Sequence, residues 1–241
     1  HHGAEIFAAA AKKQVAVAYE AAVAGGIPII KALRDGLVAN RIEWVAGIIN
    51  GTTNFILTEM SQKGSAFADV LKEAQRLGYA EADPTFDVEG IDAAHKLVIL
   101  ASIAFGMPLE IKKIYTEGIT TITQEDIRYA AELGYCIKHL GIARESEAGV
   151  ELRVNPTLVP NDSLLAKVDG AKNAVMVMGD AVGPTLYSGA GAGSEPTASA
   201  VIADIVDVAR AVSHDKTKYE HHLPVPYMGF VSSAIKAREI L

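Results

Sequence analysis

The sequence of 241 residues has little of several features that would mark a specialised protein. Its single cysteine, Cys136, excludes an internal disulfide, and the apolar surroundings favour a small buried side chain over a reactive thiol. No cluster of cysteine and histidine predicts a zinc site. The net charge is −7 and no long basic run occurs, which argues against nucleic-acid binding, because phosphates are held by clustered lysine and arginine. No apolar run reaches the ~20 residues of a membrane helix, so we expect no membrane contact.

The chain as a whole has the composition of an ordinary globular protein, 50% hydrophobic and 21% charged. The length allows a sizeable core and predicts one or two domains. No signal peptide opens the chain, so we expect a cytoplasmic protein. The sequence starts without methionine, and residues 213–241 are charged and weakly periodic, as a linker would be. We therefore expect the natural chain to be longer at both ends.

Helices and strands are predicted in mixed order along the chain. Helices are predicted at 4–13, 28–34, 54–63, 67–77, 88–105, 123–133 and 197–212, with a short one within 161–169. Strands are predicted at 15–19, 42–49, 136–144, 149–158, 174–179 and 185–187. Such an order favours an α+β fold, with one mixed sheet covered by helices on one side. No stretch has the uninterrupted βαβαβ order of a nucleotide-binding half.

The most informative stretch is 78–105, where acidic residues precede one lysine and an apolar run follows it. The acidic residues are Glu81, Asp83, Asp87, Glu89 and Asp92. Asp87 is predicted to cap the long helix. Asp92 comes four residues before Lys96, so the two share a helix face. An ammonium near an apolar interior is costly unless it is paired or functional, and a functional one can give and take protons. A plain salt bridge on the helix surface is the alternative.

Two acidic residues, Glu81 and Asp83, fall in the loop before that helix. A carboxylate there suits the binding of a substrate ammonium group. Solvated loop acids are the alternative, and the pattern alone does not separate the two.

Glycines recur from Gly189 to Gly193, immediately before a predicted helix. Backbone N–H groups at such a position can receive an anion or a cofactor. Close packing of backbone against backbone would also require glycine, and the segment comes too late in the chain to be the first turn of a Rossmann domain.

A further candidate site is the small-residue turn of Glu20 with residues 23–27. Small residues leave carbonyl oxygens free to face a hard cation, which prefers oxygen ligands. A tight turn without any ligand is the alternative.

Four motifs together closely resemble homoserine dehydrogenase, in order and in spacing, over about residues 4–212. They are YEAAVAGGIPII (19–30), GIINGTTNFILTEM (47–60), LGYAEADPTFDVEGIDAAHKLVILASIAFG (77–106) and SGAGAGSEPTASAVIADI (188–205). The resemblance implies an oxidoreductase that uses NADP or NAD to interconvert L-homoserine and L-aspartate 4-semialdehyde. It places the protein on the route to threonine, methionine and isoleucine.

The resemblance also implies roles for residues that match the family motifs. Lys96 matches the proposed acid and base, and Asp92 the carboxylate that orients the substrate. Glu81 matches the residue that holds the substrate amino group, while Tyr79 and Asp87 belong to the same substrate site. All five fall within 79–96, the stretch that the residue pattern singles out.

Three further sets of positions follow from the resemblance. A monovalent cation, Na⁺ or K⁺, would be ligated largely by backbone carbonyls of Glu20, Val23, Gly25 and Ile27. The nicotinamide end of the cofactor would lie against Gly189, Gly191 and Gly193. The turn at 50–54 would lie near the substrate.

The family's architecture predicts a mixed sheet with helices on one face, similar to the second domain of glyceraldehyde-3-phosphate dehydrogenase, and a homodimer formed through the sheets. Residues 14–187 would form the catalytic and dimerisation domain. Segments 1–13 and 188–212 would pack on a nucleotide-binding domain, and 213–241 would be a linker. The family's N-terminal phosphate loop has no counterpart here, and the chain stops where many members continue into an ACT domain. We therefore expect this chain alone to show little turnover.

Two other functions are open on the sequence alone. One is a non-catalytic dimerisation or small-molecule-binding module, in which Asp92 and Lys96 form a structural ion pair. The other is a lyase that uses Lys96 as a Schiff-base nucleophile, which the neighbouring carboxylates disfavour because they stabilise the charged ammonium.

Overall fold

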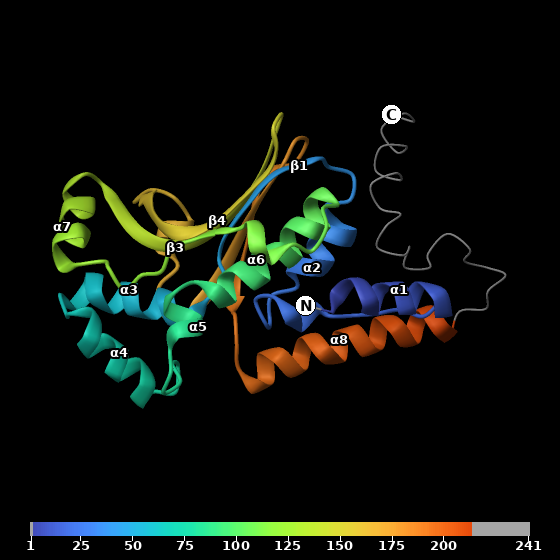
Figure 1. The fold of residues 1–241 in the computed structure, drawn as a ribbon, viewed down its shortest axis with the longest axis horizontal. Coiled ribbons are helices and arrows are strands. Elements are labelled where there is room, and N and C mark those ends of the chain that lie inside the picture. Colours follow the sequence, from blue (N-terminus) through green and yellow to red (C-terminus); the bar gives the residue numbers. More distant parts are fainter. Residues whose placement is uncertain (1, 214–241) are drawn as a thin grey trace.

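The computed structural model describes residues 2–213, so the expected linker at 213–241 lies outside the described residues except for Ser213. A six-stranded sheet in the order β2-β4-β3-β1-β5-β6 forms the centre (Figure 1). Every neighbouring pair is antiparallel except β2 and β4, which are parallel. The predicted α+β fold with a mixed sheet is confirmed. The strands are β1 Ile42–Ile48, β2 Tyr115–Thr116, β3 Tyr135–Ser146, β4 Gly149–Pro160, β5 Lys172–Gly179 and β6 Gly183–Ala190.

Most of the helices gather on one side of this sheet, where α6 crosses its face, and α7 lies at one end (Figure 1). The α-helices are α1 Gly3–Lys13, α2 Ile29–Lys31, α3 Gly51–Lys63, α4 Phe67–Arg76, α5 Thr85–Val88, α6 Ile91–Phe105, α7 Gln124–Glu132 and α8 Ser194–Ser213. The remaining helical turns are η1 Glu20–Ala22, η2 Ala32–Gly36, η3 Ile111–Lys113 and η4 Leu165–Lys167. Within residues 2–213, no helix combines the length and the apolar character that crossing a bilayer requires.

The main core lies between α6 and the face of the sheet that it covers. Leu97 and Leu100 of α6 are fully buried there together with Val45 of β1 and Val175 of β5. A Cβ atom at Gly141 of β3 would lie 2.9 Å from Ile49 Cδ1 and 3.4 Å from Leu97 Cδ1 of α6, so glycine leaves room for both side chains over the sheet. Packing of α6 on the centre of the sheet therefore fixes the position of this helix, including its polar N-terminal end.

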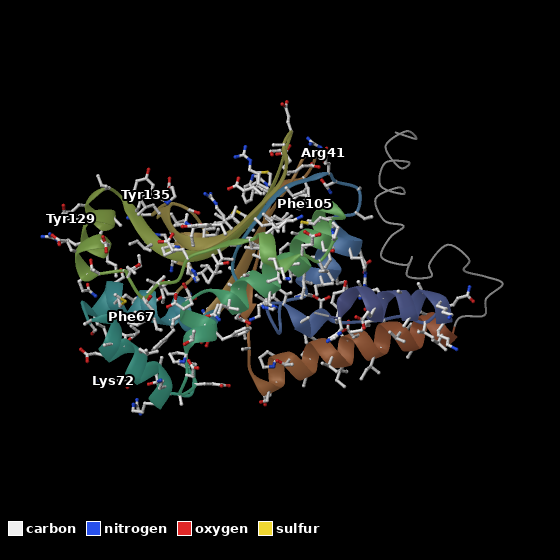
Figure 2. All side chains as sticks on the ribbon, in the orientation of Figure 1. Arg41, Phe67, Lys72, Phe105, Tyr129 and Tyr135 are labelled. Carbon is white, nitrogen blue, oxygen red and sulfur yellow. The ribbon has the colours of Figure 1, made fainter. Side chains whose placement is uncertain are left out.

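The opposite face of the sheet is only partly covered. Leu165 and Val168, in and after η4, pack with Leu140 of β3 over one half of it. Arg41 lies toward one end of the sheet, whereas Tyr129 of α7 and Tyr135 of β3 lie at the other (Figure 2). Between these ends, the uncovered face presents half-buried apolar side chains, which are Trp44, Ile142, Met176 and Leu186.

Local signals predicted several boundaries well. Thr123 and Asp126 form the expected capping box at the start of α7. Gly78 has the expected left-handed conformation after α4, with φ of +78°. These features are confirmed because they depend on residues within one turn of each other.

Three predicted elements differ in the structure. Residues 15–19 form no strand, because alternation of apolar residues supplies no neighbouring sheet edge to pair with. Asp87 does not cap the long helix; it belongs to α5, and Gly90 with φ of +79° stands before α6. The last strand is longer than predicted and includes Gly189 and Ala190.

Candidate active site

Asp92 and Lys96 meet on α6 as their spacing predicts. Lys96 Nζ lies 2.7 Å from Asp92 Oδ2, and it also donates to the carbonyl oxygen of Ile49 at 3.3 Å. The side chains are 23% exposed for Lys96 and 19% for Asp92. The ammonium is therefore neither sealed in the core nor free on the open surface, and it is fixed between α6 and the end of β1.

Asn50 connects this pair to two further elements. Its Nδ2 donates to Asp92 Oδ2 at 2.9 Å and to Asp87 Oδ1 at 2.8 Å. Its Oδ1 accepts from the Thr53 backbone N–H at 2.9 Å, which caps α3. Sequence reasoning placed only a turn near the substrate here. The available signal was the N-cap itself, because an asparagine that caps with its oxygen keeps two N–H donors for carboxylates.

The other predicted substrate residues are brought together in part. Tyr79 accepts a hydrogen bond at its carbonyl from Thr52 Oγ1 at 2.7 Å, and its ring packs 4.9 Å from that of Phe55. Asp87 joins the site through Asn50, in place of the capping role predicted for it. Glu81 is exposed, and its carbonyl accepts from Gln75 Nε2 at 3.0 Å. No contact ties its carboxylate to the lysine pair within residues 2–213, so its role stays a prediction.

The small-residue turn 23–27 lies against loop 189–193, in which the last two residues of β6 are followed by the bend that leads to α8. The Gly26 N–H donates to the Ala190 carbonyl at 3.0 Å. A Cβ atom at Gly25 would lie 2.5 Å from the Gly191 carbonyl oxygen, and one at Gly191 would lie 2.0 Å from Asn173 Cγ. Packing against backbone therefore accounts for glycine at 25 and packing against the Asn173 side chain for glycine at 191, while contact with a cofactor stays a prediction.

The carboxylate of Glu20 is committed to the protein itself. Its two oxygens accept from the backbone N–H groups of Ile30 and Lys31, each at 2.8 Å, at the start of α2. Burial raises the pKa of Glu20, although these two amides act in the opposite direction. Within residues 2–213, no three side chains of histidine, cysteine, aspartate or glutamate form a metal site. Ligation of a cation by backbone carbonyls of this segment stays a prediction.

Residues 28–206 match the family model described as homoserine dehydrogenase. The chain belongs to the homoserine dehydrogenase family. A homoserine dehydrogenase of Pseudomonas aeruginosa is 65% identical over 240 residues, which are 100% of this chain and 54% of that protein. One of Neisseria gonorrhoeae is 60% identical, again over 100% of this chain and 54% of that protein. The chain thus spans about half the length of the curated relatives it matches.

Solved structures of the family share this fold. A crystal structure of a homoserine dehydrogenase from Thiobacillus denitrificans matches with a TM-score of 0.87 at 71% identity, over 92% of this chain and 50% of that one. A hyperthermophilic archaeal homoserine dehydrogenase in complex with NADPH matches with a TM-score of 0.75 at 28% identity, over 87% and 60%. The sheet and helices described above are therefore those of homoserine dehydrogenases.

The glycine-containing residues 189–193 are where the family resemblance predicts the nicotinamide end of the cofactor. Loop 189–193 leads into α8, and the buried side chain of Asn173 lies under it with Oδ1 lacking a hydrogen-bond partner. A buried polar atom without a partner is unusual, and a ligand at the loop is one way to account for it. Contact between residues 189–193 and a cofactor stays a prediction, with the Asn173 amide buried beneath them.

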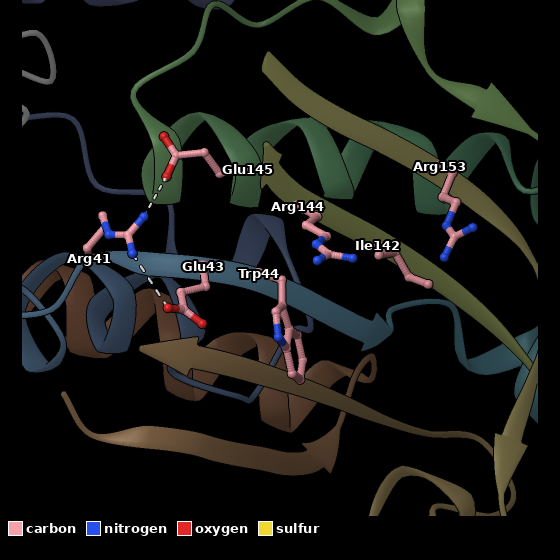
Figure 3. Close-up of a pocket in the computed structure, with 7 residues that line it drawn as sticks. All are labelled: Arg41, Glu43, Trp44, Ile142, Arg144, Glu145 and Arg153. Atoms are coloured by element: carbon pink, nitrogen blue, oxygen red, sulfur yellow. Dashed lines mark ion pairs between the residues drawn. The ribbon is translucent and has the colours of Figure 1, made fainter. Parts of the chain in front are cut away.

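Two cavities are described in the structure, and neither is lined by Lys96 or Asp92. One of about 320 Å³ lies between α3, α7 and β3. The other, of about 560 Å³, lies on the less covered face of the sheet, where Arg41 pairs with Glu43 and Glu145 (Figure 3). Its lining residues are Arg41, Glu43, Trp44, Ile142, Arg144, Glu145 and Arg153.

Proposed function

We propose that this chain carries the substrate-binding and proton-transfer residues of an enzyme that interconverts L-homoserine and L-aspartate 4-semialdehyde with NAD or NADP. The observation that carries the proposal is the arrangement of Asn50, Asp92 and Lys96, in which a half-buried ammonium shares one carboxylate with a fixed amide. The family membership supports the substrate, and the geometry supports the role of each group.

Oxidation of the alcohol removes a proton from its hydroxyl oxygen and a hydride from its carbon. When bound, the nicotinamide cofactor accepts the hydride. Neutral Lys96 would take the hydroxyl proton, and in the reverse direction its ammonium would return a proton to the developing alkoxide. In both directions a positive charge beside that oxygen stabilises the alkoxide. Asp92 and the Ile49 carbonyl hold Nζ in place, which limits the directions in which the amine can point.

The substrate carries an ammonium and a carboxylate, and acidic groups near Lys96 suit the ammonium. We propose that Glu81 binds it, with Tyr79 lining the same site and Asp87 held toward it by Asn50. The contact between Thr52 and Tyr79 supports this arrangement, because it ties the loop of Tyr79 to the start of α3, where Asn50 lies.

We further propose that segments 1–13 and 188–212 pack on a nucleotide-binding domain, while 14–187 form the catalytic domain. Support comes from the helix α8, on which several large apolar side chains are exposed. These are Val201, Ile202, Ile205, Val206 and Val212. The half-length match to the relatives agrees with a further domain in the whole protein.

The partly covered face of the sheet supports the proposal of a homodimer. Trp44, Ile142, Met176 and Leu186 are only half-buried there, and a second copy of the sheet would cover them. A monovalent cation at backbone carbonyls of 20–27 and a role in threonine, methionine and isoleucine synthesis in the cytoplasm belong to the same proposal.

Replacing Lys96 tests the function directly. In a full-length protein that contains this chain, Lys96→Ala should lower kcat for L-homoserine oxidation by roughly 10²-fold or more, since a positioned acid or base contributes that much. Lys63→Ala is a matched control, because Lys63 forms a similar pair with Glu59 four residues away on the surface of α3. Turnover that survives Lys96→Ala would instead indicate a structural ion pair, as in a non-catalytic module.

A further inference from the structure

Asn173 is a buried polar residue that the proposed reaction does not yet use. It stands near the start of β5 and is 1% exposed. Its Oδ1 has no hydrogen-bond partner, and its side-chain amide makes no hydrogen bond to any of the residues 2–213. Leaving buried donors and acceptors unpaired is destabilising, so an amide at this position calls for a reason other than packing.

The position of Asn173 connects it with the lysine site. Ala174 pairs with Ile48 in the neighbouring strand β1, so Asn173 lies beside Ile49. The Ile49 carbonyl is the one that accepts from Lys96 Nζ at 3.3 Å. A Cβ atom at Gly51, the first residue of α3, would lie 3.5 Å from Asn173 Oδ1. The amide is therefore next to the elements that hold Asn50 and Lys96.

On its other side, Asn173 supports the glycine loop. It pairs with Gly189 of β6, and a Cβ atom at Gly191 would lie only 2.0 Å from Asn173 Cγ. The backbone of Asn173 is held separately, because Ser188 Oγ donates to its carbonyl at 3.2 Å. The side chain is thus the part of this residue that has packing contacts and no polar partner, and it fills the space beneath Gly191.

We propose that Asn173 is a positioning residue for cofactor binding. Its amide sets the height of loop 189–193, and it acquires its hydrogen bonds from that loop when a nicotinamide cofactor occupies the site. The proposal rests on the proposed function. At 1% exposure the amide acts through the loop and not by touching the cofactor itself. An apolar side chain of the same size would fill the space equally well. The hydrogen bonds proposed for the cofactor-bound state are therefore what accounts for an amide at this position.

The test compares cofactor affinity, stability and turnover in a full-length protein that contains this chain. Asn173→Leu keeps the size and removes the amide. We expect its thermal stability without cofactor to equal or exceed that of the wild type, because an unpaired buried amide is lost. We expect its Kd for NADPH, measured by nicotinamide fluorescence, to rise roughly 10-fold. The KM for L-homoserine, measured at saturating cofactor, should stay near the wild-type value.

Asn155→Leu is the matched control, because Asn155 also has an Oδ1 without a partner but stands in β4, beyond β3 and β1 from β5. It should leave the Kd for NADPH unchanged. If Asn173→Leu does not fold, Asn173→Ser provides the same comparison with a smaller side chain. Wild-type affinity for NADPH in the folded variant overturns the proposal, as does equal weakening of NADPH and L-homoserine binding with lost stability.

Measuring Lys96→Ala alongside separates this inference from the proposed function. If Lys96→Ala keeps full turnover, the proposed proton transfer is wrong, and Asn173 is still judged by the Kd for NADPH. If Lys96→Ala is inactive but binds NADPH, and Asn173→Leu also binds it normally, only the role of Asn173 is wrong.

Discussion

Two lysines lie on opposite faces of the same sheet, and their surroundings differ. Lys96 of α6 is 23% exposed and shares the Asp92 carboxylate with Asn50. Lys138 of β3 is 4% exposed, and its Nζ donates to the Val168 carbonyl at 2.7 Å and to Asp169 Oδ1 at 3.1 Å. The sequence analysis singled out the first and did not mention the second, although the second is the more deeply buried.

The difference shows that burial of an ammonium group is not by itself evidence of a catalytic role. The Val168 carbonyl also accepts from Asn54 Nδ2 of α3 at 3.0 Å, so Lys138 and Asn54 hold the segment before β5 from two sides. Such a closed arrangement stabilises one conformation. Lys96 keeps part of its surface accessible, and its carboxylate partner is held by another donor, which is the geometry that the proposed proton transfer requires.

The largest expected contrast comes from truncating the two lysines. Lys138→Ala should lower the free energy of unfolding by about 2–4 kcal/mol, because a buried stem is lost and a cavity remains. Turnover per folded molecule should be retained. Lys96→Ala should change the free energy of unfolding by less than about 1 kcal/mol, since the pair is partly solvated, while turnover is lost. Chemical denaturation with activity assays on the full-length protein measures both, and an unstable Lys96→Ala with an inactive Lys138→Ala would reverse the comparison.

A smaller effect is expected from Asn50→Ser. Serine still caps α3, but its hydroxyl cannot bridge Asp87 and Asp92 as the amide does. We expect kcat to fall roughly 10-fold, the usual effect of losing a hydrogen bond to a charged group.

Thr123→Ala is the control, because it removes the cap of α7, away from the lysine pair. It should lower stability by about 1 kcal/mol and leave kcat unchanged. Equal kcat losses in both variants would show that Asn50 acts only as a cap.

The smallest effect is a pH dependence of stability that arises at His139, the residue after Lys138 in β3. Its Nε2 lies 2.8 Å from the Glu117 carbonyl, and its Nδ1 is buried without a partner among the described residues. Burial lowers the pKa of His139 below its ordinary 6.5, against the weaker opposite influence of Glu117 and Glu89. Below pH 6.5 His139 binds a proton in the unfolded chain, whereas in the folded chain the buried ring stays neutral until the pH reaches its lower pKa. Stability is therefore complete above this pH and falls as the pH drops toward the lower folded-state pKa.

Denaturation at several pH values checks this, with a slope of at most about 1.4 kcal/mol per pH unit between the two pKa values. His139→Leu removes the titrating group and should flatten the curve below pH 6.5. An unchanged slope in His139→Leu would assign the acid sensitivity to other groups.

The sequence predicted those features that depend on neighbouring residues. The pairing of Asp92 with Lys96 and the capping box at Thr123 each need only one helical turn, and both are present. What the sequence did not show depends on contacts between distant segments. Asn50 reaches Asp87 across 37 positions. A one-dimensional pattern does not reveal that the Asn173 amide would be buried without a partner, and it suggested a strand at 15–19 that has no sheet edge to join.

The central place of β1 has a consequence for how the chain is made. Strand β1, at Ile42–Ile48, pairs with β3, at Tyr135–Ser146, and with β5, at Lys172–Gly179. A ribosome synthesises the N-terminal part first, so β1 emerges well before either of its neighbours exists. Until those strands are translated, both hydrogen-bonding edges of β1 lack their partner strands and are open to pairing with other molecules.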